Sequence, residues 1–449
     1  MSTLATDTRV LDRPSLTAPA GPTRSRVFPL VVFVLTFGLL LSDYMSRQVL
    51  SAVFPFLKVE WSLTDTQLGA LTSIVALTVG LLAIPLSLLG DRWGRSKAII
   101  AMAGLWSFAT LGSAIAANYE QMMVARLFIG LGEAAYGSVG LAVVLMVFSP
   151  TKRASLTGAF MAGGSFGSVL GVFLGGILAV QLGWRWSFGV MALLGLVLVA
   201  LYALFINDRK LARNQHPGNL PAETTGTTET IGDTVATTKR AKLRTLVSTP
   251  AVICAYVGSG LQLLVAGALF AWLPSYLNRA YGLAPDKAGV AAAGFILLMG
   301  LGMIVCGILT DRMSRTVPIR KWTTALVYAA LSLVLLPLGF AQAPGTLQLV
   351  LIAVGAFFAA GTAGPAGAMV ANLTPASIRA TAFGTLTMAN NLLGLAAGPL
   401  VVGLLADKIG LVDAMKFMPL VSILSITALL IGRAAYPSSI RRAGAVASA

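Results

Sequence analysis

Hydrophobic positions along the chain fall into twelve long runs separated by mostly short polar segments. The runs span approximately residues 27–57, 66–89, 98–117, 120–148, 154–181, 186–206, 249–277, 286–310, 322–341, 346–373, 379–406 and 412–435. About 20 consecutive apolar residues are enough for a helix to cross the hydrocarbon core of a bilayer. The pattern therefore predicts an all-α membrane protein with twelve transmembrane helices.

Composition and charge placement agree with this prediction. The 449 residues are 57% hydrophobic and only 11% charged, and the formal net charge is +16. Most Lys and Arg residues lie in the tails and in alternate polar segments, which is the positive-inside pattern of membrane proteins and not a nucleic-acid surface. An even number of spans places both termini on one side. We therefore expect a multi-pass protein of the cell membrane with both termini in the cytoplasm.

The polar segments divide the chain into five parts. Residues 1–26 are predicted to be a disordered cytoplasmic tail, and residues 207–248 a flexible cytoplasmic linker of low hydrophobicity. The linker separates an N-terminal six-helix half, 27–206, from a C-terminal six-helix half, 249–436. Residues 437–449 are predicted to be a second cytoplasmic tail.

The two halves repeat each other in sequence. The stretch "GDRWGR" (90–95) follows the second run and "TDRMSR" (310–315) follows the eighth; "RASLTGAF" (153–160) opens the fifth run and "RATAFGTL" (379–386) opens the eleventh. Both matches occur at nearly the same offset. A parallel repeat of two halves, with the binding site between them, is a recurring transporter plan.

The two loop motifs resemble the signature of the major facilitator superfamily, and the resemblance extends over nearly the whole chain. It implies the major facilitator fold and a cytoplasmic gate that latches the two halves. The residues assigned to this gate are Asp91, Arg92, Arg95, Asp311 and Arg312. The alternative is that these charges only set the topology.

Two further stretches narrow the resemblance. "RLFIGLGEAAYGS" (126–138) and "NNLLGLAAGPLVVGLLAD" (390–407) are similar to the spinster-like branch, which implies lysophospholipids, sphingoid lipids or other amphipathic substrates. The first stretch is also similar to the anion–proton symporter branch, which implies sugar acids and other organic anions.

Four charged residues lie well away from the ends of predicted membrane helices: Asp43, Arg47, Arg126 and Glu133. A charge at the centre of a membrane helix costs about 2.5–3.5 kcal/mol on insertion scales, and such residues mark transport pathways. We expect Arg47 and Arg126 to bind an anionic substrate group, Glu133 to be the main proton site and Asp43 an auxiliary one. The alternative is that these residues form two static ion pairs with a structural role, one between Asp43 and Arg47 and one between Arg126 and Glu133.

Other polar and aromatic residues in the runs complete the expected substrate site. The C-terminal half has no charge in the middle of a run, so its candidates are the amides of Gln262, Asn390 and Asn391. In the N-terminal half, Tyr44 and Tyr136 are aromatic candidates, for which ordinary packing is the alternative. The fifth run also has glycines at four-residue intervals from Gly163 to Gly175, a spacing that lets two helices approach closely.

The sequence excludes several function classes. No Gly-Lys pair occurs, so the chain has no phosphate-binding P-loop. Its single histidine, His216, lies in the linker, so neither a metal site, an enzyme activity nor a cofactor is expected. We expect a proton-linked secondary active transporter of small organic or amphipathic anions, functional as a monomer and working by alternating access. A lysophospholipid or sphingoid carrier and a non-transporting membrane sensor are the alternatives.

Overall fold

The computed structural model describes residues 27–216, 249–374 and 378–448, except for the side chains of 90–91, 153–154, 379–380 and 442–448. The predicted tail 1–26 and linker residues 217–248 lie outside the described residues. The described part is almost entirely helical, and 12 of its helical spans are long and apolar enough to cross a membrane. The predicted all-α class and the number of spans are confirmed.

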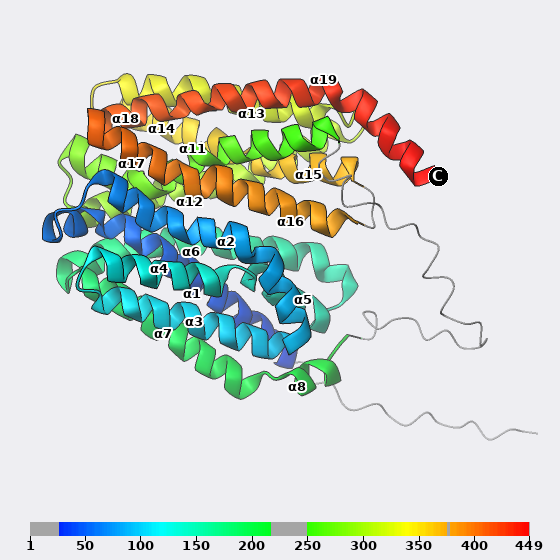
Figure 1. Ribbon diagram of the computed structural model, residues 1–449, viewed down its shortest axis with the longest axis horizontal. Coiled ribbons are helices and arrows are strands. Elements are labelled where there is room, and N and C mark those ends of the chain that lie inside the picture. Colours follow the sequence, from blue (N-terminus) through cyan, green and yellow to red (C-terminus); the bar gives the residue numbers. More distant parts are fainter. Residues whose placement is uncertain (1–26, 217–248, 375–377, 449) are drawn as a thin grey trace, which may run out of the picture.

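The helices form two bundles that lie side by side (Figure 1). The N-terminal bundle contains α1 (Val27–Glu60), α2 (Asp65–Trp93), α3 (Arg95–Ile115), α4 (Tyr119–Glu133), α5 (Tyr136–Val147), α6 (Arg153–Gln181) and α7 (Trp184–Phe205). The C-terminal bundle contains α11 (Pro250–Tyr281), α12 (Pro285–Ser314), α13 (Arg320–Ala341), α14 (Thr346–Ala360), α15 (Ala363–Leu373), α16 (Arg379–Ala389), α17 (Ala397–Ile409), α18 (Leu411–Phe417) and α19 (Val421–Ser448). Helix α2 borders the other bundle along α16 and α17 (Figure 1).

Four of the predicted membrane runs are not single uninterrupted helices, and the last of them, at 412–435, is divided into α18 and α19 by the short segment Met418–Leu420. The run at 120–148 is divided into α4 and α5, and the run at 346–373 into α14 and α15. The two breaks lie at equivalent places in the two halves. In the run at 379–406, a π-helical segment, Asn390–Ala396, joins α16 to α17. Such irregular backbone in a membrane span is tolerated where protein surrounds it, and π-helical turns are frequent at functional sites.

The ends of the predicted linker and tail also contain helix. The first linker residues form α8 (Asp208–Arg213), and the Asp208 carboxylate accepts a hydrogen bond of 2.8 Å from the backbone N–H of Ser96. The predicted C-terminal tail continues α19 as far as Ser448. Helix α8 therefore lies against the start of α3.

The glycine ladder of the fifth predicted span packs α6 against α1. A Cβ atom at Gly171 would lie 2.6 Å from the carbonyl oxygen of Met45, and one at Gly167 would lie 2.7 Å from that of Leu41. Since a side chain at either position would collide with the backbone of α1, only glycine permits this approach. The ladder fixes the α1 segment that carries Asp43 and Arg47.

The buried apolar core differs between the two ends of the molecule. We call the end that carries α8 and the C-terminus the inner end, and the opposite end the outer end (Figure 1). Towards the outer end, one cluster contains residues of both halves, such as Phe54 and Leu68 with Trp272 and Val402. Two separate clusters fill the rest. One lies within the N-terminal half and reaches Leu211 of α8; the other lies within the C-terminal half and reaches Tyr436 of α19. Among the described residues, the halves therefore share a buried apolar cluster only towards the outer end.

Candidate intramembrane binding site

The four charges predicted within the membrane come from two helices of the N-terminal half. Asp43 and Arg47 lie one turn apart on α1, and Arg126 lies on α4, of which Glu133 is the last residue. A carboxylate is unfavourable at a helix C-terminus, where the unpaired carbonyl groups make the end negative. A cation from a neighbouring helix can offset this effect.

Arg47 supplies that cation. Its Nη1 donates a hydrogen bond of 2.7 Å to Oε1 of Glu133, and the two side chains are only 11% and 9% exposed. Neither of the static pairs considered from the sequence, Asp43 with Arg47 or Arg126 with Glu133, is among the ion pairs of the described residues. The observed pair joins α1 to α4, a combination that neighbours in sequence could not reveal.

Arg126 is fully buried and only partly bonded. Its Nη1 donates to the carbonyl oxygen of Arg47 at 3.4 Å, and its guanidinium lies 5.1 Å from the ring centroid of Phe188. Its Nε and Nη2 have no hydrogen-bond partner among the described residues. Leaving a buried charged donor unbonded is costly. These two N–H groups form one edge of the guanidinium, and such an edge matches the two oxygens of a carboxylate or phosphate.

The two acids of the cluster each have a carboxylate oxygen without a hydrogen-bond partner among the described residues. Oδ1 of Asp43, whose side chain is 1% exposed, and Oε2 of Glu133 make no hydrogen bond within the described part of the chain. The cluster thus combines unpaired N–H donors with unpaired carboxylate acceptors in a buried setting. Such a set can bind an anion and can also hold a proton.

The three amide candidates of the C-terminal half differ in whether their side chains have hydrogen-bond partners. Gln262 on α11 is fully buried, and neither its Oε1 nor its Nε2 has a partner among the described residues. Oδ1 of Asn390 accepts a bond of 2.8 Å from Ser259, and Nδ2 of Asn391 donates one of 2.9 Å to the carbonyl oxygen of Thr387. Both asparagines lie in the π-helical segment.

Gln262 lies at about the depth of the charge cluster. The rings of Phe54 on α1 and Trp272 on α11 are in contact, with centroids 5.1 Å apart. Gln262 precedes Trp272 by the same number of residues as Tyr44 precedes Phe54, and each residue of a helix advances about 1.5 Å. Gln262 therefore brings unsatisfied polar groups of the C-terminal half to about the depth of Asp43 and Arg47.

The two predicted tyrosines have different surroundings. Tyr44 is half-buried, and its ring lies against Gly164 and Gly167 of α6. Tyr136 is fully buried; its hydroxyl donates a bond of 2.7 Å to the carbonyl oxygen of Thr36, and its ring packs edge-on against Trp106. The hydroxyl of Tyr136 is thus engaged by the backbone of α1.

The predicted cytoplasmic gate lies at the inner end. Arg92, Asp311 and Arg312 are exposed, and Nη1 of Arg95 contacts the Met146 sulfur at 3.7 Å within the N-terminal half. The side chain of Asp91 lies outside the described residues. Within the described part of the chain, no ion pair or hydrogen bond joins these gate residues across the halves, so the gate stays a prediction for another conformation.

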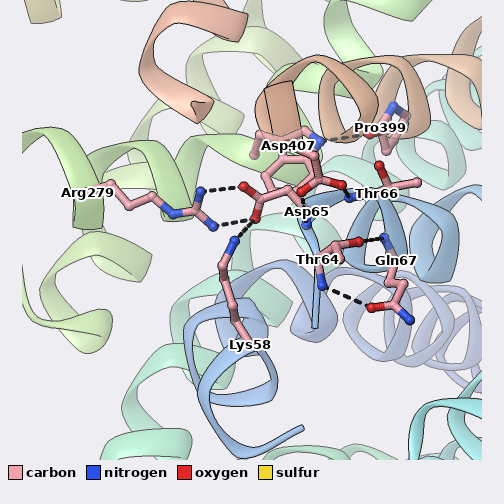
Figure 2. Close-up of polar contacts among 9 residues, drawn as sticks. Lys58, Thr64, Asp65, Thr66, Gln67, Arg279, Pro399 and Asp407 are labelled. Atoms are coloured by element: carbon pink, nitrogen blue, oxygen red, sulfur yellow. Dashed lines mark hydrogen bonds and ion pairs between the residues drawn. The ribbon is translucent and has the colours of Figure 1, made fainter. Parts of the chain in front are cut away.

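Sequence reasoning missed the polar residues that join the halves at the outer end. Figure 2 shows them: Asp65 lies between Lys58 and Arg279, and Asp407 lies at the start of α2. The available signal was weak, because each is a single acid at a helix end. Other charged residues, Lys58, Glu60 and Lys408, stand close to them, so no local pattern distinguishes them.

Comparison with known proteins gives consistent matches. The family model of the Major Facilitator Superfamily matches residues 36–341 and 255–446. The chain is 24% identical over 283 residues to the hexuronate transporter of Bacillus subtilis, covering 63% of this chain and 64% of that protein. It is also 24% identical over 318 residues to the sphingosine-1-phosphate transporter SPNS2 of Danio rerio, covering 68% of this chain and 60% of that protein. Each match thus spans less than two thirds of the relative.

One relative and one solved structure match over more of their length. The chain is 26% identical over 391 residues to a probable 4-methylmuconolactone transporter of Cupriavidus pinatubonensis, covering 85% of this chain and 84% of that protein. The inward-facing, unoccupied crystal structure of a bacterial homologue of the human lysosomal transporter spinster covers 93% of this chain and 98% of its own, with a TM-score of 0.76 and 17% identity. At that identity the structural match shows the fold.

Proposed function

Because the chain belongs to the Major Facilitator Superfamily, we propose that this transporter carries small organic or amphipathic anions, linked to protons, by alternating access. The observation that carries the proposal is the buried cluster of Asp43, Arg47, Arg126 and Glu133, in which a guanidinium edge and two carboxylate oxygens have no partner among the described residues. Relatives named as transporters of hexuronate, which has a carboxylate, and of sphingosine-1-phosphate, which has a phosphate, support the substrate class.

Substrate binding is assigned to the arginines. The unpaired edge of Arg126 would accept a carboxylate or phosphate in a two-pronged arrangement, which is stronger and more directional than a single bond. Arg47 would contribute when its bond to Glu133 is released. The unsatisfied amide of Gln262 would meet the same substrate from the C-terminal half, and Tyr44, Asn390 and Asn391 would line its path.

The net charge of the four clustered residues supports the proposed proton linkage. With both acids ionised, the two acids and the two arginines are neutral together; protonating an acid leaves a net positive charge that attracts an anion. Protonation of Glu133 also removes the charge that holds Arg47. Proton and anion would therefore bind together, with Glu133 as the main proton site and Asp43 as the auxiliary site.

Flux into proteoliposomes tests the proposal. The full chain is reconstituted, a pH gradient is imposed, and uptake of radiolabelled glucuronate is compared with uptake of sphingosine-1-phosphate. Arg126→Lys keeps the positive charge but loses the guanidinium edge, so we expect a fall in kcat/KM of roughly 100-fold. Arg185→Lys, which changes an exposed arginine of the same half, is the matched control and should transport normally.

The outcomes separate the candidate functions. Preference for glucuronate supports a small-anion carrier, whereas preference for sphingosine-1-phosphate supports the lipid carrier, a candidate favoured by the likeness to SPNS2. Binding of either compound without flux would mean a membrane sensor. Normal transport by the Arg126→Lys protein would remove Arg126 from the binding site.

A further inference from the structure

We propose that Asp65 and Asp407 form the outer gate of the transporter, a polar latch that links the two halves and must open when the substrate site faces the outer side. The latch consists of Lys58, Asp65, Arg279 and Asp407 (Figure 2). The proposal rests on the alternating-access part of the proposed function. It is independent of which anion is carried.

Asp65 binds cations from both halves. Nη1 of Arg279 donates to Oδ2 at 2.8 Å and Nη2 donates to Oδ1 at 2.6 Å, which makes a two-pronged bridge from α11 to α2. Nζ of Lys58, on α1, donates to Oδ1 at 2.6 Å. Asp65 is 3% exposed, so water competes little for these bonds. Two-pronged arginine–carboxylate bridges are the stronger kind of ion pair.

Asp407 adds a second bridge in the opposite direction. Its carboxylate, on α17 of the C-terminal half, accepts bonds from the backbone N–H groups of Asp65 at 2.7 Å and Thr66 at 2.9 Å. The first N–H groups of a helix lack partners within it, and a negative charge is favoured there. Thr64 bonds to Gln67 in a capping box, so the start of α2 is capped jointly by its own half and by the other half.

The backbones meet directly beside these bonds. A Cβ atom at Gly403 of α17 would lie 2.5 Å from the carbonyl oxygen of Asp65, and one at Gly69 of α2 would overlap the carbonyl oxygen of Pro399. The two glycines therefore allow α2 and α17 to touch. The shared apolar core, in which Phe54 packs against Trp272, also joins the two halves towards this end.

The contacts of the latch can separate and form again, as a gate requires, so they need not join the halves permanently. Arg279 and Lys58 are 28% and 37% exposed on their side chains, so solvent reaches the cations and can replace their partners when the helices part. All the partners lie at helix ends, where a small rotation of one half separates them without unfolding a helix. Lys58 would keep Asp65 paired within its own half after Arg279 leaves.

Distance measurement between spin labels tests the latch. Labels are placed at Val59, which is 82% exposed at the end of α1, and at Ala343, which is exposed in the outer connection between α13 and α14. Asp65→Asn and Asp407→Asn each weaken the bridges while keeping the side-chain shape. Each bond lost involves a charge, and hydrogen bonds to charged groups are stronger than those between neutral groups. We therefore expect each variant to raise the open-to-closed ratio by about tenfold or more.

The matched control is Asp413→Asn. Asp413 forms a 2.7 Å ion pair with Lys416 inside α18, near the same end, but this pair does not cross the halves. It should leave the distances unchanged. Wild-type distances in folded Asp65→Asn and Asp407→Asn proteins, or an equal shift in the control, would overturn the proposal.

A milder variant covers the case in which the Asn variants do not fold. Arg279→Lys keeps the charge but loses one of the two bonds, so we expect an intermediate shift toward the open distance. An unchanged distribution in this variant would equally overturn the latch. Because no substrate is needed, a failure here leaves the proposed anion transport standing, and a failure of transport leaves the distance result interpretable.

Discussion

The two ends of the molecule are held together differently. At the outer end the halves share one apolar core, and two carboxylates bridge α2 to α11 and α17. Towards the inner end each half has its own core, and the described gate residues make no bond across the halves. Under the proposed alternating access, the outer end would have to separate and the inner end would have to join. Each half has a separate core only towards the inner end, since the outer cluster contains residues of both halves.

The comparison also explains where the charges lie along the membrane. Arg47 precedes Lys58 by eleven residues on α1, which corresponds to roughly 16 Å along the helix. The charge cluster thus lies at the inner edge of the shared core, which begins at Met45 on α1 and includes Phe188, whose ring lies next to Arg126. The joined outer end therefore lies between the cluster and the outer side.

The largest effect is expected in a test of which end of the molecule faces the cytoplasm. In a chain with Cys254 and Cys306 replaced by Ala, single cysteines are placed at Arg213 in α8 and at Val59, both exposed. An impermeant maleimide added to intact cells should label Val59→Cys fully and Arg213→Cys only after permeabilisation. The opposite result would reverse the orientation predicted from the positive-inside rule.

A large effect is expected when the helices at the outer end cannot touch. Gly69→Ala inserts a methyl group against the Pro399 carbonyl, and overpacking of this kind costs about 1–3 kcal/mol. We expect the closed outer state to lose population, and transport to fall about tenfold or more in the flux assay. Gly104→Ala, where nothing lies within 4 Å of the added atom, is the control. Equal transport by the two variants would argue against close contact of α2 and α17 in the working protein.

Glu133→Gln separates binding from proton linkage. The amide keeps the shape of the protonated acid, so we expect loss of accumulation driven by a pH gradient, while exchange of internal for external substrate continues. Proteoliposome counterflow measures the exchange, and uptake under an imposed gradient measures accumulation. If Glu133 served only to hold Arg47, the variant would be unstable instead, since removing one partner of a buried pair costs about 3–5 kcal/mol. A stable variant that still accumulates substrate would move the proton site to Asp43.

The smallest effect is expected at the inner end. Arg92 is exposed and makes no described bond across the halves, so Arg92→Gln should leave the melting temperature within about 2 °C of wild type, as expected for a surface substitution. Transport should still fall a few-fold, because the predicted gate forms only when the inner end closes. Arg209→Gln, an exposed arginine of α8, should change neither quantity. A large loss of stability in Arg92→Gln would show that the gate is already formed.

The sequence alone determined the fold class, because hydrophobic runs of bilayer length permit only membrane helices and the internal repeat indicates two similar halves. It also identified Asp43, Arg47, Arg126 and Glu133, since a charge inside an apolar run stands out. The sequence could not show which of these four residues bond to each other. Glu133 bonds to Arg47 across a separation of 86 residues, and the break after Glu133 interrupts a run that is apolar on both sides.

Only the tertiary structure decided which end of the molecule is joined. The contacts of Asp65 with Arg279 and with Asp407 span 214 and 342 residues. Their residue types are ordinary for helix ends, so no local pattern marks them. Likewise, the structural role of Gly69 and Gly403 depends on the carbonyl groups of the other half, which leave no room for a side chain there. Apolar patterns record which surfaces avoid water, whereas the pairing of helices depends on the packing of both halves against each other.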